Sequence, residues 1–234
     1  MIITIDGPVA TGKSTIAKKL AHEIGFIYFD TGAMYRGFTY GLIKHHIDSD
    51  DLPAIEEYLK KFQFEIRVKH GYRHYFVEGE DVTDTIRGPE VTARVSKISA
   101  IPMVRDKLVA IQRELSSGVN AIFEGRDTGS VVFPNAEIKI FLTGDAQTRA
   151  LRRYKELKEK YPEKYSDLTL EKTIEEIKSR DEYDTNRKTS PLLKAADAYT
   201  IDTTNLTLEE IVILILEYKD TKPYLTAKIP PLNM

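Results

Sequence analysis

Residues 7–14 read G-x-x-x-x-G-K-S, and the place of this stretch in the chain constrains the fold more than any other feature. It follows an apolar, β-branched run at residues 1–5 and precedes apolar residues at helical spacing that end at Gly25. A second apolar run at 26–29 completes a strand, loop, helix and strand, which is a βαβ unit. In such a loop, successive backbone N–H groups wrap a phosphate, and the following helix offers its positive end to the anion. The sequence therefore predicts a phosphate-binding loop.

The chemistry of this loop predicts a nucleoside triphosphate as its ligand. Gly7 and Gly12 permit backbone angles and a close approach that side chains would block. Lys13 can reach the β- and γ-phosphates, and the Ser14 hydroxyl can ligate Mg²⁺, which we expect as the metal cofactor of ATP. The residues expected to line this phosphate site are Gly7, Pro8, Val9, Ala10, Thr11, Gly12, Lys13, Ser14 and Thr15.

Short apolar strands alternate with helical segments along the chain. The predicted strands are 1–5, 26–29, 121–124, 137–143 and 198–202, which indicates a five-stranded parallel sheet covered by helices on both faces. The capping box from Thr207 to Glu210 favours a final helix, although the IVILIL run after it would also fit a strand. We therefore predict an α/β fold with the phosphate-binding loop after its first strand, an arrangement that does not by itself separate a switch, a motor, a pump and a metabolic kinase.

Two polar segments interrupt this core. The first, 48–95, contains alternating apolar residues in 62–68 that pair back on 74–79, which predicts an antiparallel hairpin. The second, 145–187, is helical and highly charged, with a break at Tyr161-Pro162. We expect one domain with a core of 1–47, 96–144 and 188–218, an insertion at 48–95, a helical lid at 145–187 and a tail at 219–234.

Composition excludes several other classes of protein. The 234 residues include no cysteine, so disulfides and thiolate metal sites are ruled out, and the net charge of −2 gives no signature of nucleic-acid binding. The six-residue IVILIL run is too short to span a bilayer. We expect a cytoplasmic monomer that binds neither nucleic acid nor membrane.

Arginines gather in the segments that follow the predicted strands. "DTGAMYR" follows the second strand and "EGRDTG" follows the third, which puts Asp30, Arg36, Arg126 and Asp127 at the edge where open parallel sheets bind ligands. No residue set looks like a base that would activate a hydroxyl or a water. An acceptor that is itself a phosphate needs no base, because its oxygen is already anionic. The pattern therefore favours transfer of a phosphoryl group onto a phosphate.

These motifs also resemble those of a known family, the bacterial cytidylate kinases among the nucleoside monophosphate kinases. The resemblance runs from about residue 3 to 218 and rests on "DTGAMYR", "EGEDVTDTIR", "EGRDTGSVVFPNAEIKIFL", "RALRR" and "IKSRDEYDTNRKTSPL". It implies an ATP-dependent kinase that phosphorylates CMP or dCMP. It also implies that 48–95 is the monophosphate-binding insertion and that 145–187 is the lid. Thr128 stands where this family usually has Met or Ile, and Ala10 where many members have Gly.

The resemblance assigns further roles position by position. It implies that the loop from Gly7 to Thr15 binds the phosphates of ATP. Arg36, Arg126 and Arg187 would hold the acceptor phosphate, Arg180 and Asp184 the ribose, and Ser96, Arg105 and Asp127 the cytosine. Thr31, where a Ser is common, and Tyr35 complete the expected CMP site. Arg149, Arg152 and Arg153 are the lid candidates for the transferring phosphate, and Lys13, Arg126, Arg149 and Arg153 form the expected catalytic set.

The base assignment also has a physical reason. Cytosine presents an N4 amino donor that the Asp127 carboxylate can accept, and N3 and O2 acceptors for Arg105. Uracil would turn its O4 acceptor toward Asp127, so we expect the site to reject UMP. Three alternatives remain open: a UMP- or AMP-type kinase, a non-catalytic nucleotide-binding module, and a regulatory GTPase, although the chain lacks the Asn-Lys-x-Asp guanine signature.

Overall fold

The computed structural model describes residues 1–69, 72–163 and 165–222. Its main sheet confirms the predicted α/β core with five parallel strands in the order β2-β6-β1-β7-β8. The strands are β1 (Ile2–Asp6), β2 (Ile27–Asp30), β6 (Ala121–Gly125), β7 (Ile138–Thr143) and β8 (Tyr199–Asp202). Because β6 lies between β1 and β2, the chain reverses direction across the sheet at β1. Ligands of open α/β sheets bind beyond the strand ends at such a switch point.

Alternate residues of each strand point to opposite faces of the main sheet. Ile3 and Ile5 of β1 and Ile122 of β6 turn toward α1 (Lys13–Ile24) and α8 (Leu208–Asp220) and are buried there. Phe123 of β6 turns to the other face, where it packs with Val109 of α5 (Pro102–Leu115). The strand ends carry polar residues with the same alternation, so Glu124 shares the α1 face with Ile122.

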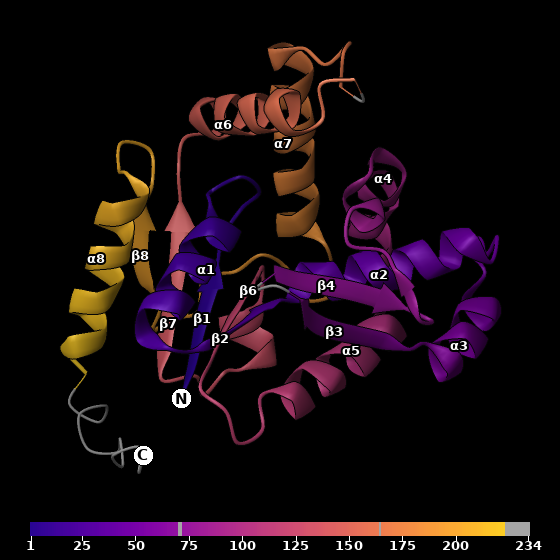
Figure 1. The fold of residues 1–234 in the computed structure, drawn as a ribbon, viewed down its shortest axis with the longest axis horizontal. Coiled ribbons are helices and arrows are strands. Elements are labelled where there is room, and N and C mark those ends of the chain that lie inside the picture. The colour runs from indigo at the N-terminus through magenta and orange to yellow at the C-terminus, as the bar shows by residue number, and fades with distance from the viewer. Residues whose placement is uncertain (70–71, 164, 223–234) are drawn as a thin grey trace.

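The segment after β2 builds a second hydrophobic core. Figure 1 shows it beside the main sheet, with α2, α3 and α4 around the strands β3 and β4. Phe38, Ile55 and Ile86 are fully buried in this core. The predicted hairpin is confirmed by antiparallel pairing of β3 with β4. The 3₁₀ turn η1 and the two-residue strand β5 have no counterpart in the sequence prediction. The elements are α2 (Thr31–Lys44), α3 (Leu52–Lys61), β3 (Phe64–Lys69), β4 (Tyr72–Val77), β5 (Glu80–Asp81), η1 (Thr85–Arg87) and α4 (Pro89–Ile98).

Two helices lie beyond the carboxyl ends of the strands. In Figure 1, α6 (Ala146–Lys160) crosses above β7 and α7 (Leu170–Asn186) returns from it toward the sheet. The helices are separated at the predicted break around Tyr161-Pro162. This arrangement places the charged segment over the edge of the sheet where ligands are expected.

The IVILIL run, whose sequence would fit either a helix or a strand, lies in the last helix. Thr207 accepts from the Glu210 N–H while the Glu210 carboxylate accepts from the Thr207 N–H, so the capping box is formed and α8 begins there. The helix extends to Asp220, two residues into the predicted tail, and the tail beyond 222 lies outside the described residues. None of the described helices is both long and apolar enough to cross a membrane.

Candidate active site

The phosphate loop takes a backbone shape that explains its glycines. Gly7 has φ of 150° and Gly12 has φ of 87°, in the region that favours glycine. A Cβ on Gly7 would stand 2.2 Å from the Leu142 carbonyl oxygen, so no side chain fits there. Ala10 also has a positive φ, of 60°. This conformation explains why glycine suits the fourth position of the loop.

Lys13 lies folded against its own loop. Its Nζ donates to the Pro8 carbonyl at 2.6 Å, and the side chain is buried. Burial, with the nearby positive charge of Arg126, lowers the pKa of Lys13 to about 7. A bound phosphate would supply the counter-charge that this ammonium needs.

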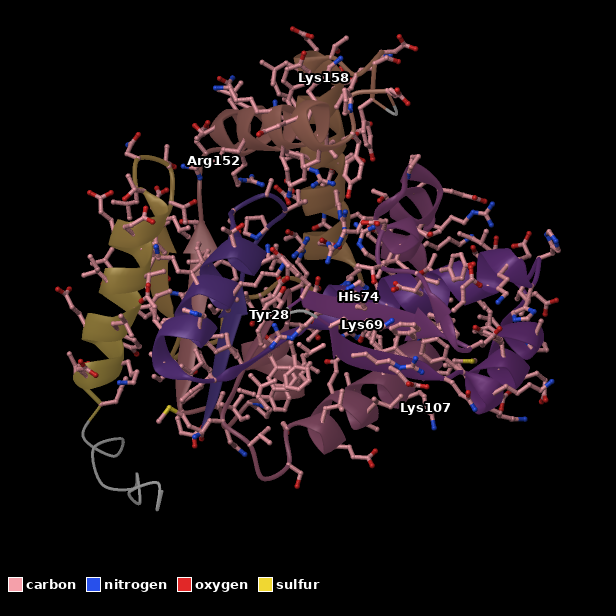
Figure 2. All side chains as sticks on the ribbon, in the orientation of Figure 1. Tyr28, Lys69, His74, Lys107, Arg152 and Lys158 are labelled. Carbon is pink, nitrogen blue, oxygen red and sulfur yellow. The ribbon has the colours of Figure 1, made fainter. Side chains whose placement is uncertain are left out.

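Glu124, which sequence reasoning missed, completes the loop on the α1 face. The Ser14 hydroxyl donates to Glu124 Oε1 at 2.6 Å, and the Tyr28 hydroxyl donates to the same oxygen at 3.2 Å. Burial raises the pKa of Glu124. Figure 2 labels Tyr28 beside α1, and the Arg73 guanidinium of β4 lies 5.2 Å from its ring. The available signal was that Glu124 precedes the Gly-Arg-Asp motif at the end of a buried strand.

A buried carboxylate fixes the turn after β6. Asp6 accepts from the backbone N–H of Thr128 and Gly129 at 2.9 and 2.7 Å, and from the Thr128 hydroxyl at 2.7 Å. These bonds hold the π-helical turn η2 (Thr128–Val132) against β1. The turn begins directly after Asp127 and thereby positions it. A threonine at 128 therefore supplies a bond that Met or Ile could not make.

The residues expected to bind the base come together in one buried cluster. The Arg105 guanidinium is hydrogen-bonded to the Asp127 carboxylate and donates to the Ser99 carbonyl at 3.1 Å. Arg187 Nη2 lies 3.6 Å from the other Asp127 oxygen. Burial raises the pKa of Asp127, and the charges of Arg105 and Arg187 oppose that shift. The Arg105–Asp127 pair thus offers both an acceptor and donors.

The serine that contacts this cluster through its hydroxyl is one turn beyond the predicted one. Arg187 Nη1 lies 3.3 Å from Ser99 Oγ, whereas Ser96 joins through its carbonyl, which accepts from Ser99 Oγ at 3.0 Å. Ser96 is half-buried on α4. The two serines are three residues apart, so both lie on the same side of the chain at the end of α4.

The residues expected to bind the acceptor phosphate and the ribose surround the same region. Arg126 Nε donates to Asp184 at 2.9 Å, which joins β6 to the lid helix α7. Arg36 donates to Thr92 Oγ1 at 2.8 Å, and Arg187 Nε to the Ser190 carbonyl at 2.7 Å. Among the residues that the structure describes, the buried Nε of Arg180 has no hydrogen-bond partner. The site therefore holds at least one buried donor that is free for a ligand.

The other two expected residues support this region from α2. The Thr31 hydroxyl donates to the Glu124 carbonyl at 2.7 Å, which ties the start of α2 to β6. The Tyr35 ring lies 5.4 Å from the Arg105 guanidinium, and burial raises the pKa of Tyr35 to about 12. Tyr35 thus contacts a member of the buried cluster, whereas Thr31 contacts the strand that precedes Asp127.

The lid arginines differ in what they contact. Arg149 is buried and donates to the Val9 carbonyl of the phosphate loop at 2.7 Å. Arg153 pairs with Glu156 at 3.0 Å on the same helix. Arg152, labelled in Figure 2, donates to the Thr203 carbonyl at 2.7 Å and so lies against the end of β8.

The positively charged side chains of this site lie close enough together to lower one another's pKa. Burial and the charges of Arg180 and Arg87 lower the pKa of Arg36 to about 9, and Arg153 contributes. Burial and the Arg126 charge lower the pKa of Arg180 to about 10. These side chains come from different elements and converge beside the phosphate loop. Such a concentration of positive charge suits a ligand with several phosphates.

A parallel sheet with a phosphate loop at its switch point, arginines from several segments and a lid over the strand ends define a P-loop kinase. The family model for cytidylate kinase matches residues 3–221. The chain therefore belongs to the cytidylate kinase family.

Relatives agree with this assignment. A cytidylate kinase of Protochlamydia amoebophila is 64% identical over 221 residues, covering 94% of this chain and 97% of that protein. One of Halalkalibacterium halodurans is 44% identical, covering 93% and 96%. Among solved structures, a shikimate kinase from Acinetobacter baumannii in complex with shikimate has a TM-score of 0.48 and 16% identity, covering 95% of this chain and 94% of that one. The structural similarity to the shikimate kinase is too distant to support a statement about function.

Proposed function

We propose that this protein transfers the γ-phosphoryl group of ATP to CMP or dCMP, giving CDP or dCDP. The observation that carries the proposal is the buried Arg105–Asp127 pair at the end of β6, beside the phosphate loop. Family membership supports the same reaction. Asp127 accepts from the cytosine N4 amino group, and Arg105 donates to N3 or O2.

The acceptor needs no general base in this reaction. The α-phosphate oxygen of CMP is anionic near neutral pH, so the enzyme has to align the two phosphates and neutralise charge. Arg36, Arg126 and Arg187 hold the acceptor, and Lys13 with lid arginines Arg149 and Arg153 balances the charge of the moving group. The charge of Arg126 acts on Lys13 and that of Arg153 acts on Arg36, and this proximity supports their roles. Closure of the lid excludes water, which would otherwise accept the phosphoryl group.

The expected Mg²⁺ fits the oxygen donors beside the loop. Among the described residues there is no cluster of three or more His, Asp or Glu side chains that would cage a metal. Mg²⁺ in kinases does not need one, because it binds through one or two protein oxygens, water and the phosphates. The adjacent Ser14 hydroxyl and Glu124 carboxylate would supply such oxygens. When bound, Mg²⁺ neutralises charge on the β- and γ-phosphates.

A coupled assay of ADP release tests the proposal. With ATP as donor, we expect turnover with CMP and dCMP and little with UMP, AMP or dTMP. Lys13→Met serves as the inactive control. Absence of turnover with both cytidine nucleotides contradicts the proposal, and a preference for UMP or AMP identifies a different nucleotide kinase. Binding of GTP in preference to ATP would instead indicate the GTPase class.

A further inference from the structure

Asp181, at the carboxyl half of α7, contacts the phosphate loop directly. Its Oδ1 accepts from the Val9 backbone N–H at 3.0 Å, and its Oδ2 accepts from Arg149 Nη1 at 2.7 Å. The same Arg149 nitrogen donates to the Val9 carbonyl at 2.7 Å. Asp181 and Arg149 therefore form hydrogen bonds with both backbone polar groups of Val9, its N–H and its carbonyl. The three residues come from the loop, from α6 and from α7.

These contacts fix the orientation of the Arg149 guanidinium. Arg149 Nε donates to the Gly144 carbonyl at 2.9 Å, so Nε and Nη1 are both committed to the protein. In the described residues, Nη2 of Arg149 makes no hydrogen bond that competes with a ligand. The Arg149 side chain is only 6% exposed and that of Asp181 19%, so solvent screens this pair little. The pairing also neutralises a carboxylate that would otherwise repel phosphate.

We propose that Asp181 is a positioning residue for the donor phosphates. It holds Arg149 against the Val9 peptide. The loop and the two lid helices are therefore preorganised for ATP before it binds, with Nη2 of Arg149 facing the phosphates. This inference rests on the proposed kinase function. Without the carboxylate, Arg149 regains its rotamer freedom and the Val9 N–H loses its acceptor, both of which have to be restored when ATP binds.

The test compares Asp181→Asn with Glu182→Gln, an exposed neighbour on the same helix. The asparagine oxygen can still accept from Val9, but its amino group then faces another donor on Arg149. We expect both the KM and the calorimetric dissociation constant for ATP to rise about tenfold in Asp181→Asn, as for the loss of one charge-assisted bond. KM for CMP stays within about twofold, the melting temperature falls by no more than a few degrees, and Glu182→Gln resembles the wild type.

A double variant tests whether the pair works as a unit. Because Asp181 acts through Arg149, adding Asp181→Asn to Arg149→Ala should weaken ATP binding little further. Three results overturn the proposal: fully additive losses, an ATP affinity in Asp181→Asn within twofold of Glu182→Gln, or tighter ATP binding in Asp181→Asn. An equal rise in KM for both substrates with a lowered melting temperature also overturns it, because it indicates general loosening. Failure of the kinase function would appear separately, as no CMP-dependent turnover in the wild type.

Discussion

Two residues of the phosphate loop are held in states that are unfavourable in the free protein. Ala10 adopts a φ of 60°, which costs a non-glycine residue about 1 kcal/mol or more. Lys13 keeps its ammonium group buried among arginines, with carbonyl and hydroxyl oxygens as its hydrogen-bond partners. Strain and repulsion of this kind gather at functional sites.

At the residue scale, Lys13 should couple ATP binding to proton uptake. Its pKa in the protein is about 7, and a nearby phosphate must raise it. At pH 8 the free protein holds Lys13 mostly neutral, so binding takes up a proton and affinity falls as the pH rises above 7. Calorimetry of ATP binding in buffers of different ionisation enthalpy measures this uptake, which should approach one proton.

Lys13→Met is the control for that measurement, because it removes the titrating group. Equal proton uptake in the variant and the wild type, or none in the wild type, would contradict the assignment of the proton to Lys13.

At the scale of elements, the turn η2 links the first strand to the base site. Its anchor, Asp6, is the last residue of β1, and its buried carboxylate accepts three bonds from Thr128 and Gly129. Burial raises the pKa of Asp6, while these bonds lower it. The position of Asp127 therefore depends on a strand more than 120 residues earlier in the chain.

Thr128→Val should lower the free energy of unfolding by an amount that depends on pH. The valine keeps the shape of threonine but removes one donor to the carboxylate, so the Asp6 pKa rises further in the folded protein. The loss of unfolding free energy is then small at low pH, where Asp6 is protonated, and grows to about 1.5–3 kcal/mol where it is ionised. Denaturation of both proteins over a series of pH values, from below the ordinary range of an aspartate up to neutral pH, measures it. A loss that shrinks with rising pH would contradict the role of Asp6.

Most elements could be predicted because their signals are local. The strands, the loop after β1, the hairpin and the capping box at Thr207 depend on periodicity, glycines and short motifs, and all are present. The insertion of β6 between β1 and β2 could not be predicted, because pairing order depends on contacts distant in sequence. The same holds for η2, whose unusual turn is fixed by a carboxylate on another strand.

The sequence also predicted some residues of the candidate site and missed others. Arg105, Asp127 and Arg187 were singled out by motif and they do lie together. Glu124 and Asp181 were missed, since a carboxylate at a strand end or in a charged helix resembles ordinary surface charge. Their significance becomes visible only through their partners, Ser14 and Arg149, which lie far away in the sequence.

At the scale of the whole molecule, three parts of the chain enclose one reaction space. The core supplies the loop, Arg36 through α2 and Arg105 through α5. The insertion supplies Arg87 through η1, and the lid segment supplies Arg153 and Arg180. Ion pairs cross these parts, as between Arg126 after β6 and Asp184 on α7. This pair joins the segment after β6 to the helix α7 of the expected lid.

We propose that Asp127 and Arg105 make this enzyme a kinase of cytidine nucleotides. The most direct measurement is the ratio of kcat/KM for CMP to that for UMP, in the wild type and in Asp127→Asn, with melting temperatures as a check on folding. We predict a wild-type ratio of at least about 100, as expected for a mismatched buried polar pair. The ratio should collapse toward one in the variant, whose amide can also donate to O4 of uracil. A wild type that uses both nucleotides equally, or a folded variant that keeps the full preference, would contradict the account.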